Sequence, residues 1–178
     1  MNSVSPFISL RGFAIPYGQV ESCGGRREFV TAATFQNPLA RIRQAFLNFG
    51  YHDADAICTP VTFFSCPYGL AFSASVSDEI WREIRGYLVG TYQFCSVQMD
   101  ERQAFYERAP DGRCAVHIRE ASVEHVTITD RPIYSGTGIW PAPGVLFCDL
   151  PPRLAALNAK FERGRRVALA REKGRVLR

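Results

Sequence analysis

Short segments in which hydrophobic and polar positions alternate recur along most of the chain. This period-two pattern is typical of β-strands that bury one face. The first segment covers residues 7–15 and ends at a Pro16-Tyr17-Gly18 turn. Proline and glycine also favour turns at 67–69 and 110–112. The same pattern predicts further strands over residues 28–30, 56–64, 70–76, 91–99, 113–118 and 123–129.

Two segments with helical spacing interrupt these strands. The first begins at Asn37-Pro38, since asparagine can cap the first-turn amides and proline suits the first helical position, and it ends at Gly50. Its apolar stripe comprises Leu39, Ile42, Phe46 and Phe49. The second is capped by Ser77 and stopped by Gly90. Its apolar side comprises Ile80, Trp81, Ile84, Tyr87 and Leu88.

A third helix is expected near the C-terminus, where it starts with Leu154, Leu157 and Phe161. Gly164 and Gly174 weaken it. Residues 151–178 hold nine basic and two acidic residues, a charge of +7, whereas residues 1–150 hold 12 basic and 15 acidic residues, or −3. We therefore expect a body, residues 1–150, and a basic C-terminal helical tail, residues 151–178. Such a tail is most often a solvated helix, and docking to an acidic partner or to nucleic acid is the alternative.

The chain has 178 residues, of which 47% are hydrophobic and 21% charged, as expected for one globular domain with a sizeable core. The order of elements argues against a Rossmann-type sheet. It predicts a mainly β (α+β) fold, a small antiparallel β-barrel or sandwich with helices on its outside.

No apolar run is long enough to span a bilayer, and the first residues lack the pattern of a secretory signal. We therefore expect an intracellular protein without a membrane segment.

Six cysteines form no CxxC pair and no regular metal spacing, which favours reduced thiols and argues against structural zinc. We expect no metal and no cofactor.

The candidate catalytic residues then include the three histidines of the chain. His52 follows the first predicted helix in a polar turn and is a plausible general base, although a surface histidine is the simpler interpretation. His125 lies on the polar face of its strand, opposite Val126 and Ile128, and His117 is interpreted as an exposed strand residue.

Two neighbouring residues compete as nucleophile. Ser96 alternates with Phe94 and Gln98, and it would act only with a histidine within hydrogen-bond reach. Cys95 alternates with Val97 and Met99, which suggests that it points into the core. The chain contains no GxSxG, Walker, HExxH or EF-hand motif.

Several motifs follow one another in the order of a known family. They are residues 10–18 with a Gly-aromatic-Ala centre, 27–30 followed by 33–35, His52-Asp53 after a helix, Gly69-Leu70 opening a strand, Ser96 six residues after Gly90, and 125–129 followed by Pro132. On these motifs, over residues 8 to 135, the chain resembles the tailed-phage prohead (capsid maturation) protease family, which is related to the herpesvirus assemblins. It departs from the family at residues 97–99, where an aromatic-Gly-aromatic run is usual, and at Ile133, where alanine is common.

This resemblance implies a serine endopeptidase with an assemblin-like barrel. Ser96 would be the nucleophile, His52 its general base, and His125 the third member of a Ser-His-His triad. Many phage members carry glutamate at the position of His125, whereas the assemblins use a second histidine there. The implied substrates are capsid and scaffolding proteins and the protease itself, inside the immature capsid (prohead) in the host cytoplasm. Self-association is left open.

Two other functions remain in competition. One is a catalytically inactive relative that serves as a structural or assembly protein of the capsid. The other is a nucleic-acid-binding module that acts through the basic tail. We do not expect nucleic acid as a partner, because the body has no basic, aromatic-lined surface in its sequence pattern.

Overall fold

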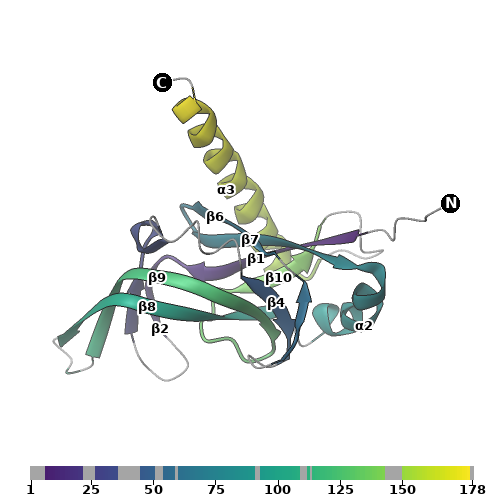
Figure 1. Cartoon of the computed structure of the whole chain (residues 1–178), viewed down its shortest axis with the longest axis horizontal. Helices are drawn as coiled ribbons and strands as arrows, with labels where there is room; N and C mark the ends of the chain where they lie inside the picture. Colours follow the sequence, from purple (N-terminus) through teal and green to yellow (C-terminus); the bar gives the residue numbers. More distant parts are fainter. Residues whose placement is uncertain are drawn as a thin grey trace.

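The strands of the computed structural model form two sheets that enclose the main core (Figure 1). The structure describes residues 7–21, 27–35, 45–50, 54–58, 60–90, 93–108, 112, 114–142 and 150–176. The smaller sheet has four strands, and each pairs with its neighbour in antiparallel fashion. In spatial order they are β10 (Gly138–Pro141), β1 (Phe7–Pro16), β7 (Gly69–Ser77) and β6 (Thr62–Cys66).

The larger sheet has six strands arranged around one long central strand. They are β2 (Gly18–Glu21), β3 (Arg27–Val30), β9 (Cys114–Thr129), β4 (Phe46–Phe49), β5 (Ala56–Cys58) and β8 (Phe94–Arg108). The antiparallel partner β8 follows one edge of β9 along its whole length. The shorter strands β3 and β4 pair with β9 in parallel on the other edge. A short 3-10 helix, η1 (Ala32–Phe35), follows β3.

The core lies between the two sheets and is closed at one end by helix α2 (Asp78–Val89). Trp81, Ile84 and Leu88 of α2 are buried in this core, as the helical spacing predicts. The predicted caps are confirmed, because the Ser77 hydroxyl accepts a hydrogen bond from the Ile80 amide at 3.3 Å and Gly90 is the C-cap. Tyr87 differs from the prediction, since its side chain is exposed.

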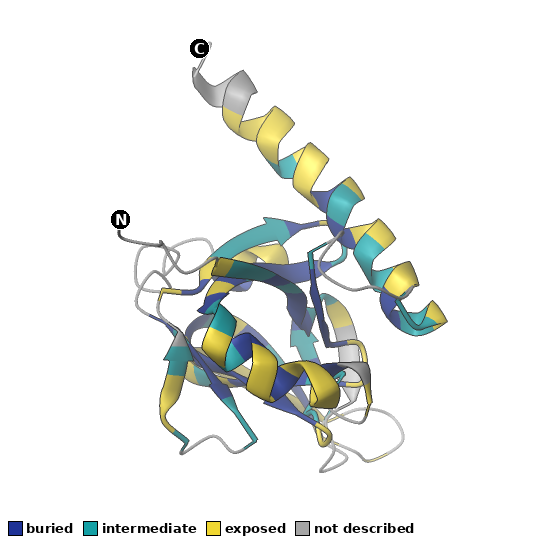
Figure 2. Cartoon of the chain, turned by 90° about the vertical axis from the view of Figure 1, so that its right-hand side faces the viewer, coloured by how far each residue is buried: buried dark blue, intermediate teal, exposed yellow. Residues whose placement is uncertain are grey.

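The C-terminal helix α3 (Pro152–Val176) docks on the outer face of the four-stranded sheet with its first half only (Figure 2). Leu154 and Phe161 bury their side chains in a second apolar cluster with Phe13 and Trp140. Burying each large apolar side chain contributes about 1.5–3 kcal/mol, whereas a partly exposed ion pair contributes about 0–1 kcal/mol. The apolar contacts therefore hold α3 in place.

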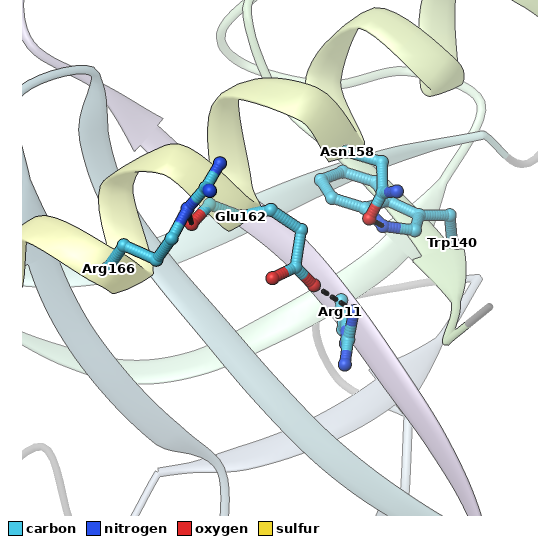
Figure 3. Close-up of polar contacts among 5 residues, drawn as sticks. All are labelled: Arg11, Trp140, Asn158, Glu162 and Arg166. Carbon is cyan, nitrogen blue, oxygen red and sulfur yellow. Dashed lines mark hydrogen bonds and ion pairs between the residues drawn. The ribbon is translucent and has the colours of Figure 1, made fainter. Parts of the chain in front are cut away.

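Polar contacts orient the docked half of α3 (Figure 3). The Trp140 indole donates a hydrogen bond to Asn158 at 2.8 Å, and Arg11 pairs with Glu162. Gly164, expected to weaken the helix, has a packing role instead. A Cβ atom there would lie 2.7 Å from the Cys66 sulfur, so only glycine lets the helix approach this strand so closely.

The mainly β, α+β class is confirmed, but the predicted small antiparallel barrel is not, because the described strands form two sheets and one of them contains parallel pairs. Backbone hydrogen bonds join the two sheets, from the Ile139 amide to the Gln93 carbonyl at 3.2 Å and from the Val61 amide to the Ala45 carbonyl at 2.9 Å. The next residue whose amide would face the larger sheet, two positions after Ile139, is Pro141, and proline has no amide hydrogen to donate. Hydrogen bonding between β10 and the larger sheet therefore cannot continue past Ile139.

The helix predicted from Asn37 to Gly50 is wrong over its second half. Residues 46–49 form β4, which pairs with β9, and residues 36–44 lie outside the described part of the chain. Phe46 and Phe49 are three residues apart, which suits one helical face but places them on opposite faces of a strand. A short apolar run is compatible with both patterns, and the partner strand decided between them.

Replacing Gly12 by alanine tests the packing of β1 against the core. The new Cβ would lie 2.4 Å from the Phe72 ring and 2.5 Å from the Gly138 carbonyl oxygen, so Gly12→Ala should lower the free energy of unfolding by about 1–3 kcal/mol. Gly86→Ala is the matched control on the exposed side of α2, where nothing crowds the new atom, and it should raise stability by about 0.5–1 kcal/mol. Urea denaturation of both variants measures the difference. Equal effects of the two changes would contradict the packing described here.

Candidate active site

The pairing of β8 with β9 brings two of the three predicted site residues together. Ser96 lies opposite Thr127, and His125 lies opposite Gln98, two pairs further along the ladder. Residues directly opposite each other in an antiparallel pair point to the same face, and diagonal neighbours are separated by about 7–8 Å. Ser96 and His125 therefore share one face of the six-stranded sheet as diagonal neighbours.

Strand β4 extends this face on the other edge of β9. Asn48 lies beside Thr127 and Phe46 beside His125 in the parallel register. The rings of Phe46 and His125 stack with centroids 5.0 Å apart and planes inclined by 23°. We call the surface formed by Ser96, His125, Thr127 and Asn48 the polar face; a row of hydroxyl, hydroxyl and amide groups crosses three strands there.

The third predicted residue, His52, lies outside the described residues, so its place relative to Ser96 stays a prediction. The structure does describe the residues that flank it. The Gly50 amide donates to the Ile128 carbonyl at 2.8 Å, and the Asn48 side-chain amide donates to the Ala54 carbonyl at 3.3 Å. Both flanks are therefore tied to strands that build the polar face.

The polar face is closed in this structure. The Ser96 side chain is 1% exposed and that of His125 is 7% exposed, and Thr127 and Asn48 are buried as well. A peptide would reach the Ser96 hydroxyl only if the part of the protein that covers it moved.

Cys95, the rival nucleophile, points to the opposite face and into the core, as its alternation with Val97 predicts. Its thiol donates hydrogen bonds to the carbonyl oxygens of Phe13 at 2.9 Å and Gly138 at 3.6 Å. Burial raises the pKa of this thiol to about 12. Because the thiolate is the nucleophilic form, Cys95 is inert at neutral pH.

Arg153, at the start of α3, places a positive charge at the same end of β8. Its guanidinium lies over the ring of Phe94 with 4.0 Å to the ring centroid, and Phe94 is two residues before Ser96. Nη2 donates to the carbonyls of Ser135 and Thr137. Burial lowers the pKa of Arg153 from its usual value. Sequence reasoning missed this residue, since only the docking of α3 brings it to β8.

His117 is far along β9 from the polar face and is held by its neighbours. Its ring stacks between Phe29 and Phe105, with 4.4 Å between centroids on each side, and its Nε2 atom lies 3.0 Å from a Glu107 carboxylate oxygen. The expectation of an exposed histidine is met only in part, because the ring is half-buried in this stack. It takes no part in the candidate site.

Sequence reasoning also missed Asn48 and Phe46. Both fell within the predicted helix, where neither would lie beside β9. The sequence Phe46-Leu47-Asn48-Phe49 gives no clear signal, since four residues are too few to distinguish the two periods.

Within the described ranges, no three His, Cys, Asp or Glu side chains gather closely enough to hold a metal ion. Among those same residues, no helix has both the length and the apolar character needed to cross a membrane. No protein-family model and no curated protein matches the sequence. The site therefore has to be judged on its own geometry and chemistry.

The buried thiol of Cys95 makes stability depend on pH in the alkaline range. The unfolded thiol ionises near 9.0, whereas the folded one ionises only near 12, so the unfolded state gains stability as the pH rises between these values. The free energy of unfolding should fall by up to about 1.4 kcal/mol per pH unit above pH 9. Urea denaturation between pH 8 and about 10 measures this slope. Above that range Tyr17 contributes as well, because burial raises its pKa to about 12.

The Cys95→Ala variant isolates the contribution of this thiol. The quantity compared is the change in the free energy of unfolding per pH unit, so a difference in absolute stability does not matter. Its stability should fall less steeply between pH 9 and about 10 than that of the unmodified protein. Cys114→Ala, which removes an exposed cysteine of the same strand pair, is the control and should keep the original slope. Identical slopes in all three proteins would show that Cys95 is accessible to solvent.

Proposed function

We propose that the protein is a serine endopeptidase of phage head maturation, with Ser96 as nucleophile, His52 as general base and His125 as its partner. The observation that carries this proposal is the juxtaposition of Ser96 and His125 on one face of neighbouring strands. These residues are 29 positions apart in the sequence and were selected by motif order alone. The anchoring of both flanks of His52 to β9 and β4 adds support.

The chemistry is acyl transfer from a peptide bond. His52 takes the proton of the Ser96 hydroxyl as its oxygen attacks the peptide carbonyl, and then returns that proton to the leaving amine. His125 accepts a hydrogen bond from the other ring nitrogen of His52 and so selects its tautomer. A neutral histidine stabilises the developing imidazolium less than a carboxylate does, so turnover is slow. An enzyme enclosed with its substrate at high local concentration tolerates slow turnover.

The fold is an opened version of the assemblin-like barrel. Backbone hydrogen bonds between Ile139 and Gln93 and between Val61 and Ala45 link its two sheets, which supports a barrel-like arrangement that is not closed. The substrates are the scaffolding protein or the scaffolding segment of the capsid protein, and the protease itself. Cleavage takes place inside the prohead, in the host cytoplasm.

The closed polar face favours one competing function. With 1% of its side chain exposed, Ser96 is less accessible than a working nucleophile has to be, which suits a catalytically inactive relative with a structural or assembly role in the capsid. The two functions differ in one property, the reactivity of the Ser96 hydroxyl.

A fluorophosphonate probe distinguishes the two functions without knowledge of the substrate. The probe phosphonylates only activated serine hydroxyls, so mass spectrometry should find the adduct on the peptide that contains Ser96. Ser96→Ala should abolish labelling. Ser122→Ala, which removes a buried hydroxyl of the same sheet, is the matched control and should label normally. Absence of any adduct on Ser96 would favour the inactive relative.

Substitutions of His125 test its role as the partner of the base. His125→Phe keeps an aromatic ring next to Phe46 but has no proton acceptor, so the labelling rate should fall by about 10²–10⁴-fold. His125→Glu restores an acceptor and should label at least as fast as the unmodified protein, because a carboxylate stabilises the imidazolium more strongly. Unchanged labelling of the phenylalanine variant would remove His125 from the mechanism, and circular dichroism confirms that both variants fold.

A further inference from the structure

Helix α3 divides at Gly164 into a docked half and a free half. Up to that residue its inward side chains are buried; after it, each described side chain except Ala168 is exposed. The free half, residues 165–176, projects away from both sheets (Figures 1 and 2). Helices shorter than about 12–15 residues are marginally stable in water by themselves. The described side chains of the free half, residues 165–172, are therefore available to a partner.

The free half overhangs a groove on the outer face of the four-stranded sheet, which we call the α3 groove. Its volume is about 300 Å³. The sheet side is lined by small hydroxyl residues, Ser9, Ser73 and Thr62, which leave space above the strands. Phe64 and Phe161 form its apolar end, and Leu169 of the free half, 45% exposed, forms its rim. The α3 groove is therefore apolar at one end and polar along its floor.

The charged residues of α3 near this groove are mostly basic. Residues 163–176 contain six basic residues and one acidic residue, Glu172, for a net charge of +5. Arg165 and Glu172 line the groove itself, and Arg11 on its floor pairs with Glu162. Outside the groove, Arg166 and Arg171 of the free half are exposed and can meet a partner that enters the groove with its apolar side.

We propose that the α3 groove and the free half of α3 form a docking site for an acidic amphipathic helix of another protein. Apolar side chains of that helix enter between Phe64, Phe161 and Leu169, and its carboxylates meet the arginines of the free half. Recognition of this kind uses one apolar face and complementary charge. Nucleic acid fits less well, because phosphate contacts do not require an apolar groove and residues 1–150 carry a charge of −3. The proposal does not depend on the reactivity of Ser96.

Fluorescence anisotropy with synthetic probes tests the proposal on the full chain. The probe is a labelled peptide of about 18 residues, roughly 27 Å of helix, built from Glu, Ala and Leu with the leucines on one face. A second peptide has the same composition with leucines spread around the helix, and a labelled DNA duplex is the third probe. At about 0.15 M salt the first peptide should bind about tenfold more tightly than the other two. Equal binding of both peptides, or tighter binding of DNA, would overturn the proposal.

Two pairs of variants locate the site. Leu169→Glu and Arg165→Glu should each weaken binding of the first peptide about tenfold or more. Tyr87→Glu and Arg85→Glu likewise replace an exposed apolar residue and an arginine by glutamate, but on α2, and should leave binding unchanged. The four variants should label at Ser96 as the unmodified protein does. Sedimentation velocity gives the remaining outcome, since a dimer that Leu169→Glu dissociates would replace the proposed partner by a second copy of this chain.

Discussion

The antiparallel ladder between β8 and β9 is the pairing on which the rest of the structure depends. It runs from the Phe94–Thr129 pair to the Arg108–Cys114 pair, with irregularities in its middle section. One side of this ladder is a wall of the main core, formed by Cys95, Val97 and their partners on β9. The other side is the polar face. Shifting the register by one residue would exchange the two faces, so burial of the apolar side also determines where Ser96 points.

Cys95 and Ser96 show how strongly strand geometry separates neighbours. The thiol is enclosed, hydrogen-bonded to two backbone carbonyls and held protonated by burial, whereas the adjacent hydroxyl lies beside Thr127 and diagonal to His125. The preference for serine as the reactive group therefore follows from which face each residue occupies. It does not follow from intrinsic reactivity, since a free thiol is the better nucleophile.

The tail shows a similar division of roles along a helix. Its first half belongs to the packed body, because Leu154 and Phe161 cover the outer face of the smaller sheet and Gly164 lets the helix approach Cys66. Its second half carries the positive charge that distinguishes the tail from the rest of the chain. The boundary of the basic segment in the sequence and the boundary of the free helix in space therefore do not coincide.

The amino-acid sequence by itself determined the features that depend on local pattern. The alternation over residues 7–15, 94–99, 114–118 and 123–129, the capped helix α2 with buried Trp81, and the inward direction of Cys95 all follow from neighbours within a few residues. The extension of β8 to Arg108 and the joining of the last two segments into one strand, β9, were not predicted. Tertiary structure alone decided that residues 46–49 are a strand, that two strands pair with β9 in parallel, and that Arg153 lies over Phe94. Each of these depends on a partner distant in the sequence, and a run of four residues such as 46–49 is too short to determine its own secondary structure. The placement of Ser96 diagonal to His125 depends on both the sequence pattern and the tertiary structure. The period-two alternation determines which face of its strand each residue occupies, and the pairing of β8 with β9 brings the two strands together.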